Sequence, residues 1–127
     1  MTMRAIKTAS APGAVASYSQ AIDTGSLVFT AGQVGLDPAT GQLVDGGIEA
    51  QAERALTNIV AVLDAAGLSM ADVVKTSCFL SDIANFEAFN AVYSRFVGDP
   101  PPARSTFAVA GLPRGALIEI EAIAART

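Results

Sequence analysis

Two charged side chains in this sequence have the type and setting needed to bind and transform a small acid. Arg104 follows the proline run 100–102 and begins an apolar stretch, so its side chain is expected at the end of a strand. A guanidinium group matches a carboxylate through two parallel hydrogen bonds. Glu119 lies in a strongly apolar stretch, where a carboxylate has to be paired, hydrogen bonded or functional. For each residue, a structural ion pair remains an alternative interpretation.

Two uncharged polar side chains complete the set of candidates. Tyr18 lies in the small, polar segment 16–20, which is typical of a loop and leaves the hydroxyl accessible to a ligand. Asn90 lies between Phe89 and Tyr93, near the apolar side of an expected helix. A phenol can orient a ligand or help to move a proton. The structural alternatives are that Tyr18 fills an edge of the core and that Asn90 caps a neighbouring loop.

The composition excludes several kinds of catalysis. The 127 residues include no His, so neither a Ser-His or Cys-His nucleophile nor an imidazole-ligated zinc ion is available. The chain has 8 basic and 12 acidic residues, and its net charge of −4 argues against nucleic acid as a partner, because phosphate binding needs a basic surface. Cys78 is expected in a buried strand with no base beside it, which argues against a nucleophilic role.

The composition also predicts one folded domain over residues 1–127. Hydrophobic residues make up 51% of the chain and charged residues 16%, which is too apolar for a disordered protein. No apolar run approaches the roughly 20 residues of a membrane helix, and residues 1–10 contain no apolar signal core. A single cysteine cannot form an internal disulfide and needs no oxidising compartment, so we expect a cytoplasmic protein without a membrane partner.

Strands and helices can be assigned from the apolar pattern and the turn signals between them. Strands are expected at 3–7, 27–30 continuing toward 32–34, 73–80, 104–110 and 116–124. A first helix is expected over 47–66, ending at Gly67, and a second from Ser81 or Asp82 until Gly98. The predicted order is strand, strand, helix, strand, helix, strand, strand.

This order predicts an α+β fold with a mixed sheet of five or six strands. Two helices cannot cover both faces of such a sheet, so both are expected on one face. In the last strand Ile118, Ile120, Ala122 and Ala124 should lie under the helices, and Leu117, Glu119, Glu121 and Ile123 should lie on the open face. An open face that is partly apolar predicts a contact with further copies of the chain, as a dimer or a trimer.

Seven short motifs give the chain a resemblance to a known family over nearly its whole length. In order, they are Tyr18-Ser19-Gln20, Thr30-Ala31-Gly32-Gln33, Asp37-Pro38-Ala39-Thr40-Gly41, Val73-Val74-Lys75-Thr76, Asn90-Ala91-Val92-Tyr93, Pro102-Ala103-Arg104-Ser105 and Ile118-Glu119-Ile120-Glu121-Ala122-Ile123-Ala124. With these motifs the chain resembles the Rid family, also called YjgF-like, of enamine and imine deaminases. The resemblance implies a chorismate-mutase-like fold and a homotrimer with sites in the clefts between subunits.

The resemblance also implies roles for particular residues. Arg104 matches the arginine that holds the substrate carboxylate, and Tyr18, Asn90 and Glu119 match positions that line the same cleft. Gly32 matches a backbone position near the substrate, with Ala31 beside it. Three places depart from the common pattern: Ala16-Ser17 replaces Gly-Pro, Ala31 replaces Ser, and Thr106 replaces a Cys found in some deaminases, with its backbone carbonyl kept. Thr106 is counted with Gly32, Ala31 and Asn90 among the expected substrate-binding positions.

The implied reaction is hydrolysis of 2-imino acids and their enamine tautomers, such as 2-aminoacrylate and the 2-iminobutanoate and 2-iminopropanoate type, to 2-keto acids and ammonia. Arg104 would hold the carboxylate, Glu119 would hold or deprotonate a water, and Tyr18 would orient the nitrogen. Neither a metal nor an organic cofactor is expected. The sequence leaves open a non-catalytic trimer that binds small carboxylates as a regulator, an RNA-cleaving or translation-inhibiting protein, and a chaperone-like role.

Overall fold

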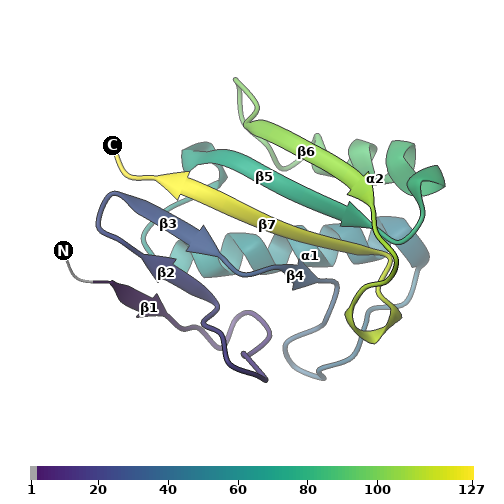
Figure 1. The fold of residues 1–127 in the computed structure, drawn as a ribbon, viewed down its shortest axis with the longest axis horizontal. Helices are drawn as coiled ribbons and strands as arrows, with labels where there is room; N and C mark the ends of the chain where they lie inside the picture. The colour runs from purple at the N-terminus through teal and green to yellow at the C-terminus, as the bar shows by residue number, and fades with distance from the viewer. Residues whose placement is uncertain (1–2) are drawn as a thin grey trace.

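The computed structural model describes residues 3–127 as seven strands and two α-helices (Figure 1). In chain order they are β1 (Arg4–Ile6), β2 (Ala21–Asp23), β3 (Leu27–Thr30), β4 (Gln33–Val34), α1 (Gly47–Ala65), β5 (Val73–Leu80), α2 (Phe86–Tyr93), β6 (Ala103–Ala108) and β7 (Ile118–Ala125). Short 3-10 turns lie at Met70–Asp72, Ile83–Asn85 and Pro113–Gly115. The α+β class expected from the sequence is confirmed.

All seven strands belong to one mixed sheet. The strand order is β1-β2-β3-β7-β5-β6, and β4 pairs with β7 beyond the end of β3. The neighbours β5 and β6 are parallel, whereas the other pairs are antiparallel.

The sheet has seven strands rather than the five or six expected from the sequence, for two reasons. The three residues of β2 are too few to show an alternating pattern, and the expected strand 27–34 is divided into β3 and β4.

Both helices cover the same face of the sheet, as the sequence predicts. In Figure 1, α1 runs behind β3, β4 and β7, and α2 lies behind the end of β6. The core between these layers combines side chains of α1, α2, β5 and β7, and its largest fully buried members include Leu56, Ile59, Leu63, Phe89, Ile118 and Ile120. Ala122 and Ala124 are also buried there, which confirms the predicted inward side of β7.

The ends of the helices differ in part from the prediction. Helix α1 ends one residue early, and Gly67 adopts the left-handed conformation, with φ of 78°, that a glycine after a helix favours. Helix α2 is much shorter than the expected helix. Residues 83–85 form a 3-10 turn, which begins at Asp82 with its carboxylate accepting a hydrogen bond from the Ala84 amide at 2.9 Å.

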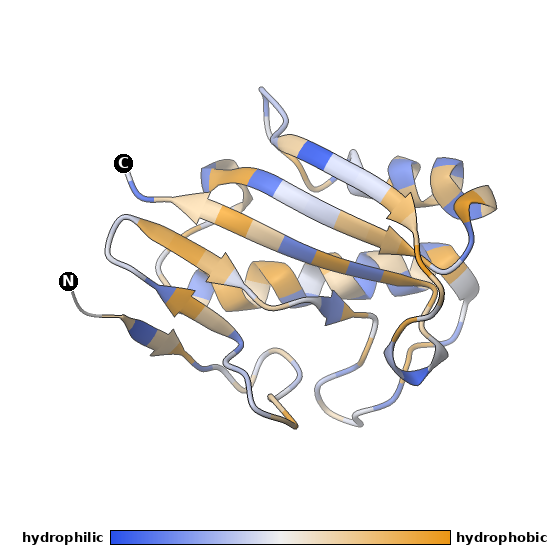
Figure 2. Ribbon diagram, in the orientation of Figure 1, coloured by the Kyte–Doolittle hydropathy of each residue, from blue (hydrophilic) through white to orange (hydrophobic). Residues whose placement is uncertain are grey.

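The open face of the sheet carries exposed aromatic side chains among polar ones. Phe29 on β3 is 41% exposed and Phe107 on β6 is 50% exposed. The Phe107 ring meets Phe79 edge to face, with 5.4 Å between ring centres. In Figure 2, orange and blue bands alternate along β7, while β3 beside it is mostly orange. This face therefore has the mixed polar and apolar character that the sequence predicts.

Neither α-helix within residues 3–127 combines the length and the apolar character that a membrane span needs.

One buried carboxylate ties both ends of the described chain to the sheet. Asp23 on β2 accepts hydrogen bonds from Arg126 at 2.6 Å, from Arg4 at 3.0 Å and from the Gly25 amide at 2.8 Å. Arg126 also donates to the Ala66 carbonyl at 2.7 Å, so the same guanidinium reaches the end of α1. The hydrogen bond from Arg126, followed by those from Gly25 and Arg4, holds the pKa of Asp23 far below its usual range.

We predict that Asp23→Asn lowers the midpoint of urea unfolding at pH 7. A carboxylate with a lowered pKa in the folded protein stabilises the fold above its unfolded pKa of about 3.9. This contribution is lost as the pH falls toward the folded value, so the gap between wild type and variant should shrink at acid pH. The control is Asp64→Asn, which changes an exposed carboxylate. Equal midpoints for Asp23→Asn and wild type at pH 7 would contradict the role of Asp23.

Candidate functional site

A bulge opposite β7 creates the first part of the candidate site. Phe29 on β3 pairs with Ile123, whereas Gln33 on β4 pairs with Ile120, so one extra residue lies between these two pairings. The Thr30 hydroxyl bridges the gap by accepting a hydrogen bond from the Ala122 amide at 3.0 Å. Bulges of this kind redirect the chain and occur beside active sites. Here the bulge places Ala31 and Gly32 next to the middle of β7.

Gly32 leaves room for the Glu119 carboxylate. A Cβ atom added at Gly32 would overlap Glu119 Oε2, so any other residue would displace this side chain. Glu119 is half-buried on the open side of β7, and that burial raises its pKa. The Glu121 carboxylate, two residues along the same face, raises it further. A carboxylate with a raised pKa can exchange a proton closer to neutral pH than an exposed one.

Glu119 and Gly32 line a cavity of about 300 Å³ with Tyr18 and Ala31. Its other walls are largely apolar and come from the N-terminal loop, β4 and the turn before β7; they include Pro12, Val15, Val34, Leu36 and Pro113. Tyr18 is 49% exposed, as expected for a loop position. The structure therefore brings together four of the seven predicted site residues, and we call this group the carboxylate half.

The other three predicted residues lie on or beside the edge strand β6. Arg104 donates a hydrogen bond to Asn90 Oδ1 on α2 at 2.7 Å. Both line a second hollow of about 450 Å³ that includes Tyr93, Pro101 and Pro102. Among residues 3–127, no carboxylate lies within ion-pair distance of Arg104. The structural alternative of an ion pair within the chain is therefore not realised, and most of the five guanidinium N–H donors remain for a ligand. We call this group the arginine half.

Three aromatic rings of α2 surround the Arg104 guanidinium, a feature that the sequence analysis missed. Its carbon lies 4.6 Å from the ring centre of Tyr93, 5.4 Å from Phe86 and 5.8 Å from Phe89. The spacing of these rings indicated only an apolar helix side. Their role follows from β6 lying beside α2, which no local pattern in the sequence reveals.

Thr106 and Cys78 lie next to each other beneath the arginine half. They are partners across β5 and β6, two residues along from the Thr76–Arg104 pair. In the described chain the Thr106 hydroxyl is buried and has no hydrogen-bond partner. Burial raises the pKa of the Cys78 thiol to about 11, so the thiol stays protonated and is a poor nucleophile. Within residues 3–127 no group of His, Cys, Asp or Glu side chains could hold a metal ion.

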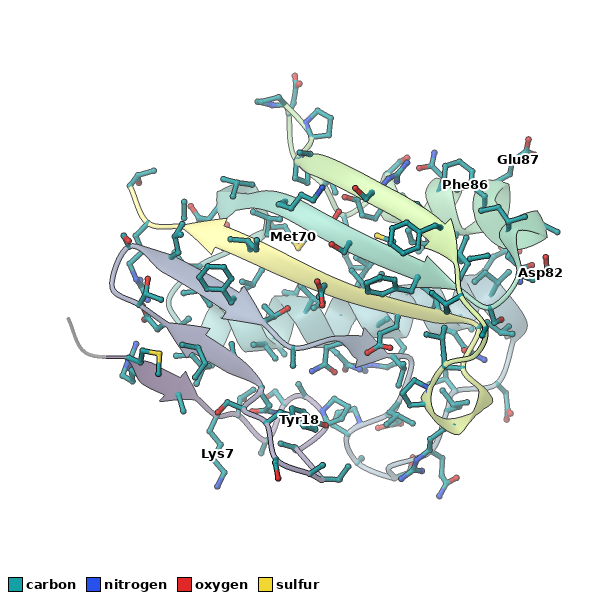
Figure 3. The ribbon with its side chains drawn as sticks, in the orientation of Figure 1. Lys7, Tyr18, Met70, Asp82, Phe86 and Glu87 are labelled. Atoms are coloured by element: carbon teal, nitrogen blue, oxygen red, sulfur yellow. The ribbon has the colours of Figure 1, made fainter. Side chains whose placement is uncertain are left out.

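The two halves lie on opposite faces of the sheet. Arg104 pairs with Thr76, and Thr76 pairs with Ala122, whose side chain is buried under the helices. Glu119 alternates with the buried Ile118 and Ile120 and faces the other way. Figure 3 labels one residue near each half: Tyr18 lies on the loop below β2, and Phe86 lies on α2 at the far side of the sheet. A ligand cannot touch both halves of one chain.

The chain thus folds as an α+β protein with one mixed sheet, and it carries an arginine on the edge strand and a glutamate on the open face. The family model described as Endoribonuclease L-PSP matches residues 8–126, so the chain belongs to this family, which is also called the YjgF or Rid family. The resemblance seen in the sequence motifs is thus confirmed.

Similar proteins include a named relative and two solved structures. A goat protein named 2-iminobutanoate/2-iminopropanoate deaminase is 47% identical over 124 residues, covering 98% of this chain and 90% of its own length. The crystal structure of Escherichia coli TdcF with bound serine has a TM-score of 0.93 and 40% identity, covering 98% of this chain and 99% of that one. RidA from the Antarctic bacterium Psychrobacter has a TM-score of 0.93 and 43% identity, covering 97% and 99%.

We predict that Gly32→Ala displaces the Glu119 carboxylate toward solvent and lowers its pKa toward the ordinary value. The added methyl group overlaps the carboxylate, and the raised pKa depends first on burial. Carbon-13 NMR titration of the glutamate side chains measures this change. The matched control is Gly13→Ala, because Gly13 lines the same cavity but a Cβ there meets nothing within 4 Å. An unchanged Glu119 titration in Gly32→Ala would refute the close contact.

Proposed function

We propose that this protein hydrolyses 2-imino acids and their enamine tautomers to 2-keto acids and ammonia. The observation that carries the proposal is that the chain offers both a guanidinium with no carboxylate partner among the described residues and a half-buried glutamate of raised pKa. The name of the goat relative, 2-iminobutanoate/2-iminopropanoate deaminase, supports the same reaction. We also propose a cytoplasmic location, which is compatible with a single free cysteine.

In the proposed reaction Arg104 binds the substrate carboxylate and Glu119 activates water. Charge-assisted hydrogen bonds from the guanidinium fix the substrate, so that the imine carbon faces one water molecule. Glu119 takes a proton from this water as its oxygen attacks the imine carbon. Glu119 returns this proton to the nitrogen, which Tyr18 orients, and a carbinolamine results. The hydroxyl proton then passes to the nitrogen, the carbon–oxygen double bond forms, and the carbon–nitrogen bond breaks. Water is consumed, and a 2-keto acid and ammonia leave, without a metal or a cofactor.

We further propose that the active unit is a homotrimer with each site between two subunits. The arginine half and the carboxylate half lie on opposite faces of one chain, so they can meet at one substrate only when different copies supply them. Cyclic assembly brings unlike faces of identical chains together. The exposed rings of Phe29 and Phe107 provide apolar surface for such a contact.

A second candidate is a trimer that binds small carboxylates as a regulator without turning them over. The observation that favours it is the serine bound to the Escherichia coli relative, since serine carries a carboxylate. Both candidates need Arg104, and only the deaminase also needs Glu119. The family description names an endoribonuclease, but the acidic charge and the absence of histidine argue against RNA cleavage by this chain.

We predict that Arg104→Ala lowers imine hydrolysis by about 10- to 150-fold, the usual effect of losing a charged hydrogen bond. An amino-acid oxidase generates the imino acid beside semicarbazide, and hydrolysis is measured as slower semicarbazone formation. The control is Arg95→Ala, which removes an exposed guanidinium that follows α2 and lies 3.7 Å from Glu53. Full activity in a folded Arg104→Ala protein would rule out the carboxylate clamp. Binding of pyruvate by a wild type that hydrolyses no imine would favour the regulator.

We predict that two inactive variants restore activity when they are assembled together. If each site combines Arg104 from one subunit with Glu119 from its neighbour, every mixed trimer of Arg104→Ala and Glu119→Gln chains keeps about one site in three intact. Co-expression with two different tags, followed by the hydrolysis assay on the doubly purified oligomer, measures this recovery. Mixed oligomers that remain inactive would place the site within one subunit.

A further inference from the structure

A buried hydrogen bond lies directly behind the arginine half. The Tyr93 hydroxyl and the Thr76 hydroxyl are 2.7 Å apart, and the two residues are 4% and 1% exposed. A hydrogen bond that water cannot reach is electrostatically stronger than the same bond at the surface. The bond therefore restrains the Tyr93 ring more firmly than packing alone would.

The strand register explains why this restraint reaches Arg104. Thr76 on β5 is the direct partner of Arg104 on β6, so their side chains leave adjacent strands on the same face. The Tyr93 side chain on α2 contacts both residues. Its hydroxyl is hydrogen bonded to Thr76, and the centre of its ring lies 4.6 Å from the guanidinium carbon of Arg104. The Tyr93 ring therefore contacts two residues, Thr76 and Arg104, whose distance from each other is set by the pairing of β5 with β6.

The position of the ring matters because an arginine side chain is long and has many rotamers. Ordering such a side chain costs conformational entropy, and a binding site in which it is already ordered gives higher affinity. The face of an aromatic ring attracts a guanidinium and leaves the N–H groups at its edge free. Asn90 holds one nitrogen of the guanidinium at 2.7 Å, while the ring supports one of its faces.

We propose that Tyr93, locked by its hydrogen bond to Thr76, is a positioning residue that orients Arg104 for carboxylate binding. Tyr93 and Thr76 act through Arg104 and need not touch the reacting atoms. This inference rests on the proposed function for the chemical class of the ligand, a small carboxylate. It adds two residues that the motif comparison did not assign to the site.

Four variants test the proposal in the assembled protein. Thr76→Val and Tyr93→Phe each remove one side of the hydrogen bond but keep the shape of the side chain, and they can be combined. Tyr93→Leu removes the ring as well. The matched control is Val62→Ala, which weakens a different buried cluster, formed with Ile6 and Val28 on the other side of the molecule. For each protein the thermal midpoint, kcat, KM and the Kd for pyruvate by calorimetry are measured.

We predict that Thr76→Val and Tyr93→Phe each raise KM and the pyruvate Kd by about two- to tenfold, as expected for one hydrogen bond, with kcat nearly unchanged. The double variant should resemble either single variant, because both remove the same interaction. Tyr93→Leu should raise both constants further, up to about 30-fold, as expected when a cation–π contact is lost. Val62→Ala should lower the thermal midpoint without changing KM or Kd.

The results separate this inference from the proposed function. If wild type binds pyruvate through Arg104 but hydrolyses no imine, the proposed function fails, and the Kd values still decide the role of Tyr93. If Thr76→Val and Tyr93→Phe leave KM and Kd at wild-type values, the positioning role is refuted while the deaminase stands. A rise in Kd for Val62→Ala as large as theirs would also refute it, because general destabilisation would then explain the effect. Absence of both pyruvate binding and imine hydrolysis in wild type would refute both.

Discussion

The alternation of side chains along β7 determines on which face of the sheet the Glu119 carboxylate lies. Ile118, Ile120, Ala122 and Ala124 have to be buried because two helices cover that face of the sheet. Since successive side chains of a strand point to opposite faces, Glu119 then has to lie on the open face. A shift of the register by one residue would move Glu119 into the core and the isoleucines onto the surface. The hydrophobic core therefore fixes the direction of the glutamate.

The same constraint separates the two halves of the site. Arg104 shares the helix-covered face with Thr76, where the rings of α2 surround its guanidinium. Glu119 lies across the sheet, against the bulge at Gly32. Each half is well ordered by its own neighbours, yet each offers only part of the chemistry that the proposed reaction needs. Under the proposed function, a folded subunit therefore does not by itself form a complete site, which would require contacts between copies of the chain.

Much of the architecture could be predicted because it depends on local patterns. Strand β5 matched its expected limits of 73–80, and the buried side of β7 was predicted correctly, since both follow from runs of apolar residues.

Other features could not be predicted from local patterns. Strand β2 was missed because its three residues carry no periodic signal. The bulge between β3 and β4 was missed because it arises from pairing with β7, which is distant in the sequence. The aromatic surroundings of Arg104 were missed for a similar reason: α2 meets β6 only after both have packed on the sheet. The oligomer and the roles of the seven site residues stay predictions.

The contacts of Asp23 have a practical consequence for engineering the protein. Because this carboxylate binds both Arg4 and Arg126, the start of β1 and the residue that follows β7 are held close together, on the left in Figure 1. An affinity tag or a fluorescent protein fused to either end would emerge from this same corner, and a short linker between the ends is compatible with circular permutation.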